Sequence, residues 1–295
     1  VKAHMRIRTI LLQRSSVKSL TFLGDMFDGV QCPCILLQLI ATGKPLSTAG
    51  MMIEDRTRTY TIAMERTVVP ENFSFRMTDE EYRVLEKIKN SIPVCYLADH
   101  ADFALGIVTG NNKKFLSAEK TEHSEMVLKG TDICKYHINP AKQYLRFEPE
   151  QFQQVAPLEI YRAPEKLLYR FISNQLVVAY DDRQMLSLNS CNIVIPKIEG
   201  MQIKYILAIL NSSVSQFVYQ KEFHSIKVLR AHMEHIPIPR VGKAIQNEII
   251  AMTEPLICGM GKEAAETCRK RLDCRIMDLF RLSAEEQWII RHALH

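Results

Sequence analysis

The sequence has 295 residues, enough for one large domain or two ordinary ones. Hydrophobic residues make up 47% and charged residues 24%, which is typical of a folded globular protein and excludes a disordered chain. The formal net charge of +5 permits an anionic partner without requiring one, because nucleic-acid-binding domains are often more basic. The sequence holds no apolar run long enough to span a bilayer, so we expect no membrane partner.

The eight cysteines indicate a reducing compartment. They are scattered, most lie within apolar runs, and the first residues lack the apolar core of a secretion signal. Free, buried thiols and a cytoplasmic location are therefore expected. Cys32 and Cys34 are close in sequence, but no second Cys or His pair stands at zinc-like spacing, so no metal site is predicted.

The first elements in chain order predict the last part of a sheet. A helix is expected over residues 5–12, and strands over residues 17–24 and 33–40. The second strand, PCILLQLI, is continuously apolar, which indicates burial on both faces as in an α/β sheet. One helix and two strands do not complete such a sheet. We therefore interpret residues 1–45 as the end of a domain whose main body lies upstream, in a longer protein.

Residues 46–97 are predicted to connect this remnant to the next domain. Two segments have strand-like composition, TRTYTIAME over residues 57–65 and NFSFRMT over residues 72–78. Thr78 and Glu81 have the spacing of a capping box, which predicts a helix over residues 79–90.

Residues 98–240 mix strands with one long helix. Strand-like runs cover residues 166–172, 175–182 and 185–197. Apolar residues at helical spacing predict a single helix over residues 203–223. The chain as a whole is thus expected to be mixed α+β.

Residues 241–295 are predicted to form a helical segment. The Ile-Pro-Ile-Pro run just before it cannot continue a helix, which sets the boundary. Ser283 and Glu286 are expected to cap the final helix, with Trp288 as the anchor of a small helical core.

The stretch ALGIVTGNNKKFL, residues 104–116, is the first candidate for a functional loop. A strand over residues 104–108 is followed by Thr109, Gly110, Asn111, Asn112 and Lys113. Gly and Asn tolerate left-handed backbone angles, which indicates a tight turn. Glycine would let the backbone approach a phosphate, Asn can pair with an adenine edge, and Lys attracts phosphate. From the residues alone, a solvated hairpin turn fits as well.

A second candidate is the basic stretch VLKGTDICKY, residues 127–136. Lys129 and Gly130 are placed at a turn, which Asp132 is expected to cap. Arg170, on a predicted strand, is a candidate phosphate ligand. Clustered cations give sequence-independent affinity for DNA through counterion release, but an ordinary charged loop fits the stretch equally well.

A third candidate follows the predicted long helix, in FHSIKVLRAHMEHIPIP, residues 223–239. Ser225, Lys227 and Arg230 could line the sugar-phosphate backbone. Their spacing would place Lys227 and Arg230 on one face if the local turn is helical. His232 and His235 lack an identifiable third ligand and are interpreted as ordinary polar residues.

Several phrases stand in a fixed order along the chain. They are GDMFDGVQCPCILLQL, ALGIVTGNNKKFL, MVLKGTDICKY, YDDRQMLSLNSCNIVIP, KYILAILNSSVSQFVYQ, FHSIKVLRAHMEHIPIP and LDCRIMDLFRLSAEEQ. In this order they resemble the carboxyl-terminal part of bacterial adenine-specific (N6) DNA methyltransferases of restriction-modification systems, over about residues 20–288. Residues 98–240 resemble the TaqI-like C-terminal specificity domain, also called the target recognition domain.

The resemblance implies a two-part parent enzyme. An upstream Rossmann-like domain would bind S-adenosylmethionine and methylate a flipped adenine, and the downstream part would bind duplex DNA and select its sequence. The present sequence holds neither an Asn-Pro-Pro-Tyr or Asp-Pro-Pro-Tyr motif nor a Gly-rich cofactor loop. We therefore expect no catalytic residue, cofactor or metal in this chain, and an upstream methyltransferase domain as its partner.

Two alternatives stay open. A restriction endonuclease is sometimes fused to or partnered with such methyltransferases, as in type IIG enzymes, but this sequence has no Pro-Asp followed by Asp/Glu-x-Lys in strand context. The chain could instead be a protein-interaction or scaffold domain of a restriction-modification or phage-defence complex. A continuous positive surface including Lys113, Lys129, Lys227 and Arg230 would favour DNA binding, and scattered positions would favour the scaffold.

Overall fold

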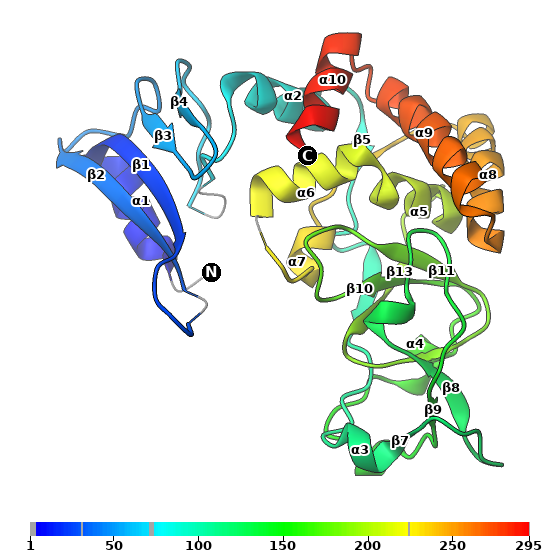
Figure 1. Ribbon diagram of the computed structural model, residues 1–295. Coiled ribbons are helices and arrows are strands. Elements are labelled where there is room, and N and C mark those ends of the chain that lie inside the picture. Colours follow the sequence, from blue (N-terminus) through cyan, green and yellow to red (C-terminus); the bar gives the residue numbers. More distant parts are fainter. Residues whose placement is uncertain (1–3, 31, 71–73, 224, 295) are drawn as a thin grey trace. The chain divides into compact units, whose positions relative to one another are not determined.

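A computed structural model describes residues 4–30, 32–70, 74–223 and 225–294. It is a mixed α+β structure with several sheets and a helical carboxyl-terminal part, which confirms the expected fold class (Figure 1). The chain divides into two compact units, residues 1–85 and 86–295. Within the described residues, every helix is too short or too polar to cross a membrane.

The first unit is built on a four-stranded sheet of order β2-β1-β3-β4. The predicted helix and two strands are confirmed, because α1 leads directly into β1 and β1 pairs antiparallel with β2. β3 pairs parallel with β1 and antiparallel with β4. The bounds are α1 Met5–Arg14, β1 Ser15–Asp25, β2 Pro33–Ala41, β3 Met52–Glu54 and β4 Thr59–Thr61.

The expected burial of β2 is wrong. Four of its large side chains, those of Ile35, Leu36, Leu39 and Ile40, are between 43% and 57% exposed, while Leu37 packs against the core. β2 lies at the edge of the sheet, and the small core of this unit forms around β1 and β3 instead. The apolar run therefore marks a strand that could be buried on both faces, but the described residues do not supply the covering layers.

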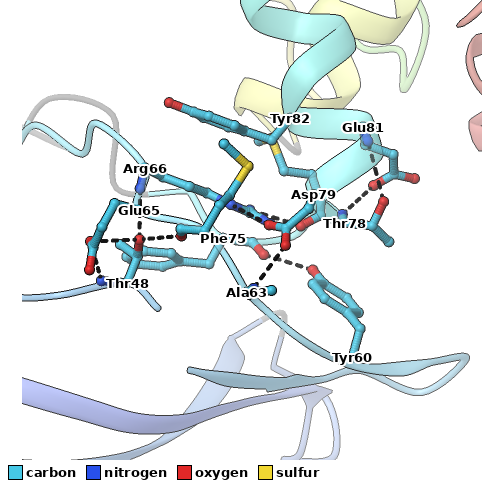
Figure 2. Close-up of polar contacts among 12 residues, drawn as sticks. Thr48, Tyr60, Ala63, Glu65, Arg66, Phe75, Thr78, Asp79, Glu81 and Tyr82 are labelled. Carbon is cyan, nitrogen blue, oxygen red and sulfur yellow. Dashed lines mark hydrogen bonds and ion pairs between the residues drawn. The ribbon is translucent and has the colours of Figure 1, made fainter. Parts of the chain in front are cut away.

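A buried arginine organises the residues after β4 (Figure 2). The Arg66 side chain is 2% exposed, and its Nη2 lies 2.6 Å from Oδ1 of Asp79. Its Nη1 donates to the carbonyl of Met77 at 2.9 Å, and its backbone N–H donates to Oγ1 of Thr48 at 2.7 Å. These contacts give the buried guanidinium an ion-pair partner and a carbonyl acceptor, as burial of a charged side chain requires.

The capping box predicted at Thr78 is confirmed. The Thr78 N–H donates to Oε2 of Glu81 at 2.8 Å, and the Glu81 N–H donates to Oγ1 of Thr78 at 3.3 Å. These two bonds satisfy amide groups that a helix start leaves without partners. The helix that follows, α2 (Asp79–Asn90), has the predicted bounds.

The strands predicted over residues 57–65 and 72–78 are largely wrong. The first is reduced to the three residues of β4, and residues 74–78 hold no strand, while 72–73 lie outside the described residues. Backbone carbonyls here accept from side chains: Phe75 from the Tyr60 hydroxyl at 2.7 Å, and Arg76 from Nη2 of Arg58 at 3.2 Å. Side-chain donors thus replace the neighbouring strand that the pattern led us to expect.

The second unit has a central antiparallel sheet of order β11-β10-β13-β6. In its register Lys166 faces Asp181, while at the other end of the same strand Arg170 faces Cys191. We call these the Lys166 end and the Arg170 end of the sheet. The strand bounds are β6 Ala101–Ala104, β10 Lys166–Arg170, β11 Val178–Asp181 and β13 Cys191–Pro196.

A smaller sheet of order β12-β8-β9-β7 shares its core with the central sheet. Ile107, Leu128, Leu168 and Leu186 are among its fully buried side chains. The short elements around it are as follows: α3 Asn112–Phe115, β7 Leu116–Ser117, β8 Glu125–Leu128, η2 Gly130–Asp132, β9 Tyr144–Leu145, η3 Pro149–Gln151, α4 Leu158–Tyr161 and β12 Leu186–Ser187.

The single helix predicted over residues 203–223 is two helices, α5 (Ile203–Asn211) and α6 (Ser213–Phe223). Ser212 lies between them with an extended ψ of 160°. Its hydroxyl donates to the Ile209 carbonyl at 2.7 Å and accepts from the Ser215 N–H at 3.2 Å. Serine therefore ends one helix and caps the next, which hydrophobic periodicity does not reveal.

The carboxyl-terminal part is helical, as predicted. Ser283 and Glu286 form the expected capping box, with N–H to oxygen distances of 2.7 and 3.2 Å. Trp288 is not a core anchor: it is 57% exposed and stacks on His292, while Ile290 is buried. The remaining bounds are β5 Val94–Cys95, α7 Arg230–Met233, β14 Ile238–Pro239, α8 Lys243–Cys258, α9 Lys262–Leu279 and α10 Ala284–Ala293.

The cysteines are free, as expected, but most of them are not buried. Cys95 and Cys191 are buried, and burial raises the pKa of both thiols. Cys32, Cys258 and Cys274 are exposed. Apolar neighbours in sequence were a poor guide, because two of these cysteines lie on the outer faces of helices and one lies in a connection.

Candidate nucleic-acid interface

The Arg170 end of the central sheet brings several of the predicted DNA-binding residues together. Nε of Arg170 donates to the Gly130 carbonyl at 2.9 Å, and Nη2 donates to the Ile133 carbonyl at 2.5 Å. Two residues further on, Ile172 forms an antiparallel bridge with Lys227. Segments around residues 130, 170 and 227 are thus joined directly by backbone and side-chain contacts.

Hydrogen bonds within the chain fix the turn at Gly130. The predicted cap is present, because the Lys129 N–H donates to Oδ2 of Asp132 at 2.8 Å. The Gly130 N–H donates to Oγ of Ser190 at 3.0 Å, and a Cβ at this position would lie 2.5 Å from the Ser190 carbonyl oxygen. A side chain here would therefore collide with backbone, so close packing explains the glycine. Lys129 itself remains partly exposed.

The second turn of this group contains Ser225 and Lys227. The Lys227 N–H donates to Oγ of Ser225 at 3.0 Å, and that hydroxyl donates to the Lys227 carbonyl at 2.9 Å. The Tyr219 hydroxyl donates to the Ser225 carbonyl at 2.8 Å, which ties the turn to α6. Ser225 therefore shapes the turn, and Lys227 is exposed and has no ion-pair partner among the described residues.

Lys227 and Arg230 do not share a helical face, which corrects the arrangement expected for them. Lys227 is extended, in its bridge to Ile172, and α7 begins only at Arg230. Nε of Arg230 lies 2.7 Å from Oε1 of Glu234, and its guanidinium lies 5.2 Å from the centre of the Phe103 ring. Glu234 partly neutralises Arg230, so Lys227 is the stronger candidate for a phosphate contact.

A buried histidine supports the start of α7. His232 stacks on Phe223, with ring centres 4.4 Å apart, and its Nδ1 accepts the Leu229 N–H at 3.2 Å. Burial lowers the pKa of His232 to about 4, so the ring is neutral at physiological pH and can accept this bond. Within the described residues, no three His, Cys, Asp or Glu side chains are placed to hold a metal ion.

The turn at residues 109–113 forms a separate group. Gly110 has a φ of +77°, as the predicted tight turn requires. Oδ1 of Asn111 accepts the Lys114 N–H at 3.2 Å and so caps α3, while the hydroxyl of buried Thr109 donates to Oδ1 of Asn112 at 2.6 Å. These contacts organise the turn itself and leave Lys113 as its exposed cation.

The two groups lie at different places in the second unit. Val108 bridges to Gln154, and Gly110 faces Gln153, which places the turn beside the smaller sheet. In Figure 1, α3 lies next to β7 and well apart from α7. The strand expected over residues 104–108 is wrong: β6 ends at Ala104, and only single bridges at Ile107 and Val108 follow it among the described residues.

A groove at the Lys166 end has a different character. Its lining includes Ile195, Ile203, Glu165, Lys204 and Glu254. Nζ of Lys204 lies 2.7 Å from Oε1 of Glu254, and the Tyr180 hydroxyl donates to Glu165. With two carboxylates and an already paired lysine, this groove is poorly suited to phosphate.

Sequence reasoning missed the exposed aliphatic residues at the Arg170 end, Ile172, Ile226 and Leu229. Val228 is buried between exposed Lys227 and Leu229, and Phe171 is less exposed than Ile172, so burial alternates over residues 171–172 and 227–229. The sequence shows neither this burial pattern nor the pairing of the two segments across 55 positions, because its exposed and less exposed positions are alike apolar.

The chain resembles solved structures of restriction-modification enzymes. The Type IIL restriction-modification enzyme MmeI, solved in complex with DNA, matches with a TM-score of 0.57 and 9% identity, over 96% of this chain and 47% of that one. At such identity the likeness shows a shared fold. The type IIG restriction endonuclease BpuSI matches with a TM-score of 0.45 and 10% identity, over 100% of this chain and 44% of that one.

A specificity subunit is also similar. The HsdS subunit from Thermoanaerobacter tengcongensis matches with a TM-score of 0.38 and 13% identity, over 73% of this chain and 50% of that one. The chain therefore spans half or less of the length of these three structures. A search of curated proteins found no significant match.

Residues 125–238 match the family model of the TaqI-like C-terminal specificity domain. The match includes η2, the strands of the central sheet from β10 to β13, and the turn at Lys227. Residues 125–238 of this chain are thus a TaqI-like C-terminal specificity domain, as the resemblance of the sequence indicated.

Proposed function

We propose that this chain is the DNA sequence-recognition module of a restriction-modification adenine-N6 DNA methyltransferase. It binds duplex DNA and positions it for a catalytic domain outside this chain. The match of residues 125–238 to a specificity domain carries the proposal. The grouping of Lys129 and Lys227 at the Arg170 end of the central sheet supports it, because clustered cations give affinity for phosphates.

The partner and cofactor belong to the proposed parent protein. An upstream methyltransferase domain would bind S-adenosylmethionine and transfer the methyl group, and a restriction endonuclease subunit or domain is a further possible partner. The exposed apolar strand β2 supports an upstream partner, since both its faces suit the interior of a larger sheet. On this proposal the chain itself supplies binding and no bond-making step.

A salt titration tests the DNA-binding role. Binding of the 295-residue chain to a fluorescent duplex would be followed by anisotropy at increasing salt. We expect affinity to fall steeply with salt, and Lys227→Ala to reduce the slope of log K against log salt by about one, because one phosphate fewer would be neutralised. Lys262→Ala, at an exposed position at the start of α9, is the matched control and should leave the slope unchanged.

The scaffold hypothesis has one observation in its favour. Thr109, Asn111, Gly130 and Ser225 all make contacts within the chain that account for their presence. If the wild-type chain binds duplex DNA with no salt dependence, or not at all, phosphate contact is absent and a protein partner becomes the better explanation.

A further inference from the structure

Aliphatic side chains surround Lys227 at the Arg170 end. Ile172 is 61% exposed, Ile226 is 58% exposed and Leu229 is 42% exposed. Ile172 and Lys227 face each other across the antiparallel bridge, and side chains alternate along an extended segment. Val228 is buried, so Lys227 and Leu229 point to the same side as Ile172. We call Ile172, Lys227 and Leu229 the aliphatic-lysine face.

This face is held rigidly. The Val228 N–H donates to the Phe171 carbonyl at 2.8 Å, and the Ser173 N–H donates to the Ile226 carbonyl at 2.9 Å. On one side Arg170 is fixed to the turn at Gly130, and on the other Ser225 closes the turn before Lys227. Exposed aliphatic groups on a fixed backbone lose little freedom when they bind a partner, which favours their use in recognition.

The charge around the face indicates an anionic partner. Lys227 has no ion-pair partner in the part of the chain that the structure describes, and Lys129 lies on the adjoining turn. A partner must therefore present negative charge beside small apolar groups. The major groove of DNA does so, because phosphates flank it and the C5-methyl groups of thymine project into it. The groove also admits a two-stranded antiparallel segment, such as residues 171–173 with 226–228.

We propose that Ile172 and Leu229 contact thymine methyl groups in the major groove while Lys227 binds a flanking phosphate. The aliphatic-lysine face would thus contribute to sequence preference as well as to affinity. This proposal rests on the proposed function, since it presupposes that the chain binds duplex DNA.

The experiment replaces thymine by uracil, which lacks the C5-methyl group. A preferred duplex is first selected from a randomised library with the full 295-residue chain. Anisotropy then compares that duplex with its uracil counterpart. Wild type should bind the uracil duplex about three- to fivefold more weakly for each methyl group that the face normally buries. The variant Ile172→Ala/Leu229→Ala should bind both duplexes equally, with an unchanged salt slope.

Two variants control for indirect effects. Leu158→Ala removes a comparably exposed aliphatic side chain from α4 and should keep the wild-type preference for thymine. Ile172→Val keeps an aliphatic contact and should therefore keep most of the preference for thymine. Circular dichroism would check the fold of each variant. If the double variant does not fold, Ile172→Ala alone takes its place, because this side chain is largely exposed.

Three results would overturn the inference and leave DNA binding intact: a selected duplex without enriched thymine, equal wild-type affinity for thymine and uracil, or an undiminished preference in the alanine variant. The last of these would show that other residues read thymine. Absent or salt-insensitive binding by wild type would instead contradict the proposed function, and this inference with it.

Discussion

The two ends of the central sheet use their cations in opposite ways. At the Lys166 end, Nζ of Lys166 lies 2.5 Å from Oδ2 of Asp181, and both side chains are 0% exposed. At the Arg170 end, Lys227 is exposed and unpaired within the described residues. Arg170, on the same strand as Lys166, is intermediate: its Nε and Nη2 are bound to carbonyls at the edge of the core. A cation is available to a partner only where the fold leaves its donors unused.

Breaking the buried pair should have the largest effect. Lys166→Met leaves the Asp181 carboxylate buried without its partner, and should destabilise the fold by about 3–5 kcal/mol. Burial lowers the pKa of Lys166, and the neighbouring Asp181 carboxylate raises it. Lys166 therefore relies on Asp181 to keep its positive charge. Urea unfolding would measure the change. Adding Asp181→Asn removes the unpaired charge and keeps an oxygen that can accept from the Arg183 or Met185 N–H, so it should restore part of the stability. A single variant as stable as wild type would contradict this account.

Removing Arg170 should have a smaller effect, of about 2 kcal/mol. Arg170→Met deprives the Gly130 and Ile133 carbonyls of charged donors, each of which is a strong hydrogen bond. The turn at Lys129 should then loosen, which would also weaken DNA binding. If Arg170 only contacts phosphate, the variant would lose affinity while its unfolding midpoint in urea stays at the wild-type value.

Acid should weaken the Arg170 end through His232. Its pKa is about 4 in the folded protein and near 6.5 when unfolded, so the unfolded chain binds the extra proton between these values. Its contribution to stability is complete above pH 6.5 and is lost as pH falls towards 4. We expect a loss of about 1–2 kcal/mol, reduced by the part of the ring that solvent reaches. Thermal unfolding of wild type and His232→Asn across this range should converge at low pH.

The smallest effect is expected at Asn111, in the turn at residues 109–113. Asn111 caps α3, so Asn111→Ala should cost about 0.5–1 kcal/mol, while Asn111→Ser should keep most of the cap. If the Asn111 amide also contacts a base, Asn111→Ser would alter the sequence selected from a random duplex library at nearly unchanged stability. An unaltered selection would limit Asn111 to capping.

Local signals in the sequence were sufficient for some of these features. The Thr78–Glu81 capping box set the start of α2, and Asp132 caps the turn at Lys129 as predicted. Both depend on residues three positions apart. The break at Ser212 was missed because a serine hydroxyl can end a helix or lie within one, and only its actual partners decide.

Features of the candidate site that depend on distant residues could not be predicted. Gly130 is required by the Ser190 carbonyl, and Lys227 is placed by Ile172, each pair being separated by more than fifty positions. The sequence indicated that these stretches carry cations. It could not show that Arg170 is tied to carbonyls while Lys227 is left exposed.

The open edge of β2 has a consequence for handling the protein. Alternate residues of β2 offer their backbone groups to a further strand, and Gln38 is the one strongly polar side chain among its nine residues. Proteins usually protect such edges with charges, bulges or proline, and here Pro33 protects only the first position. At high concentration this edge is therefore a template for aggregation, and a lysine placed on β2 should improve solubility.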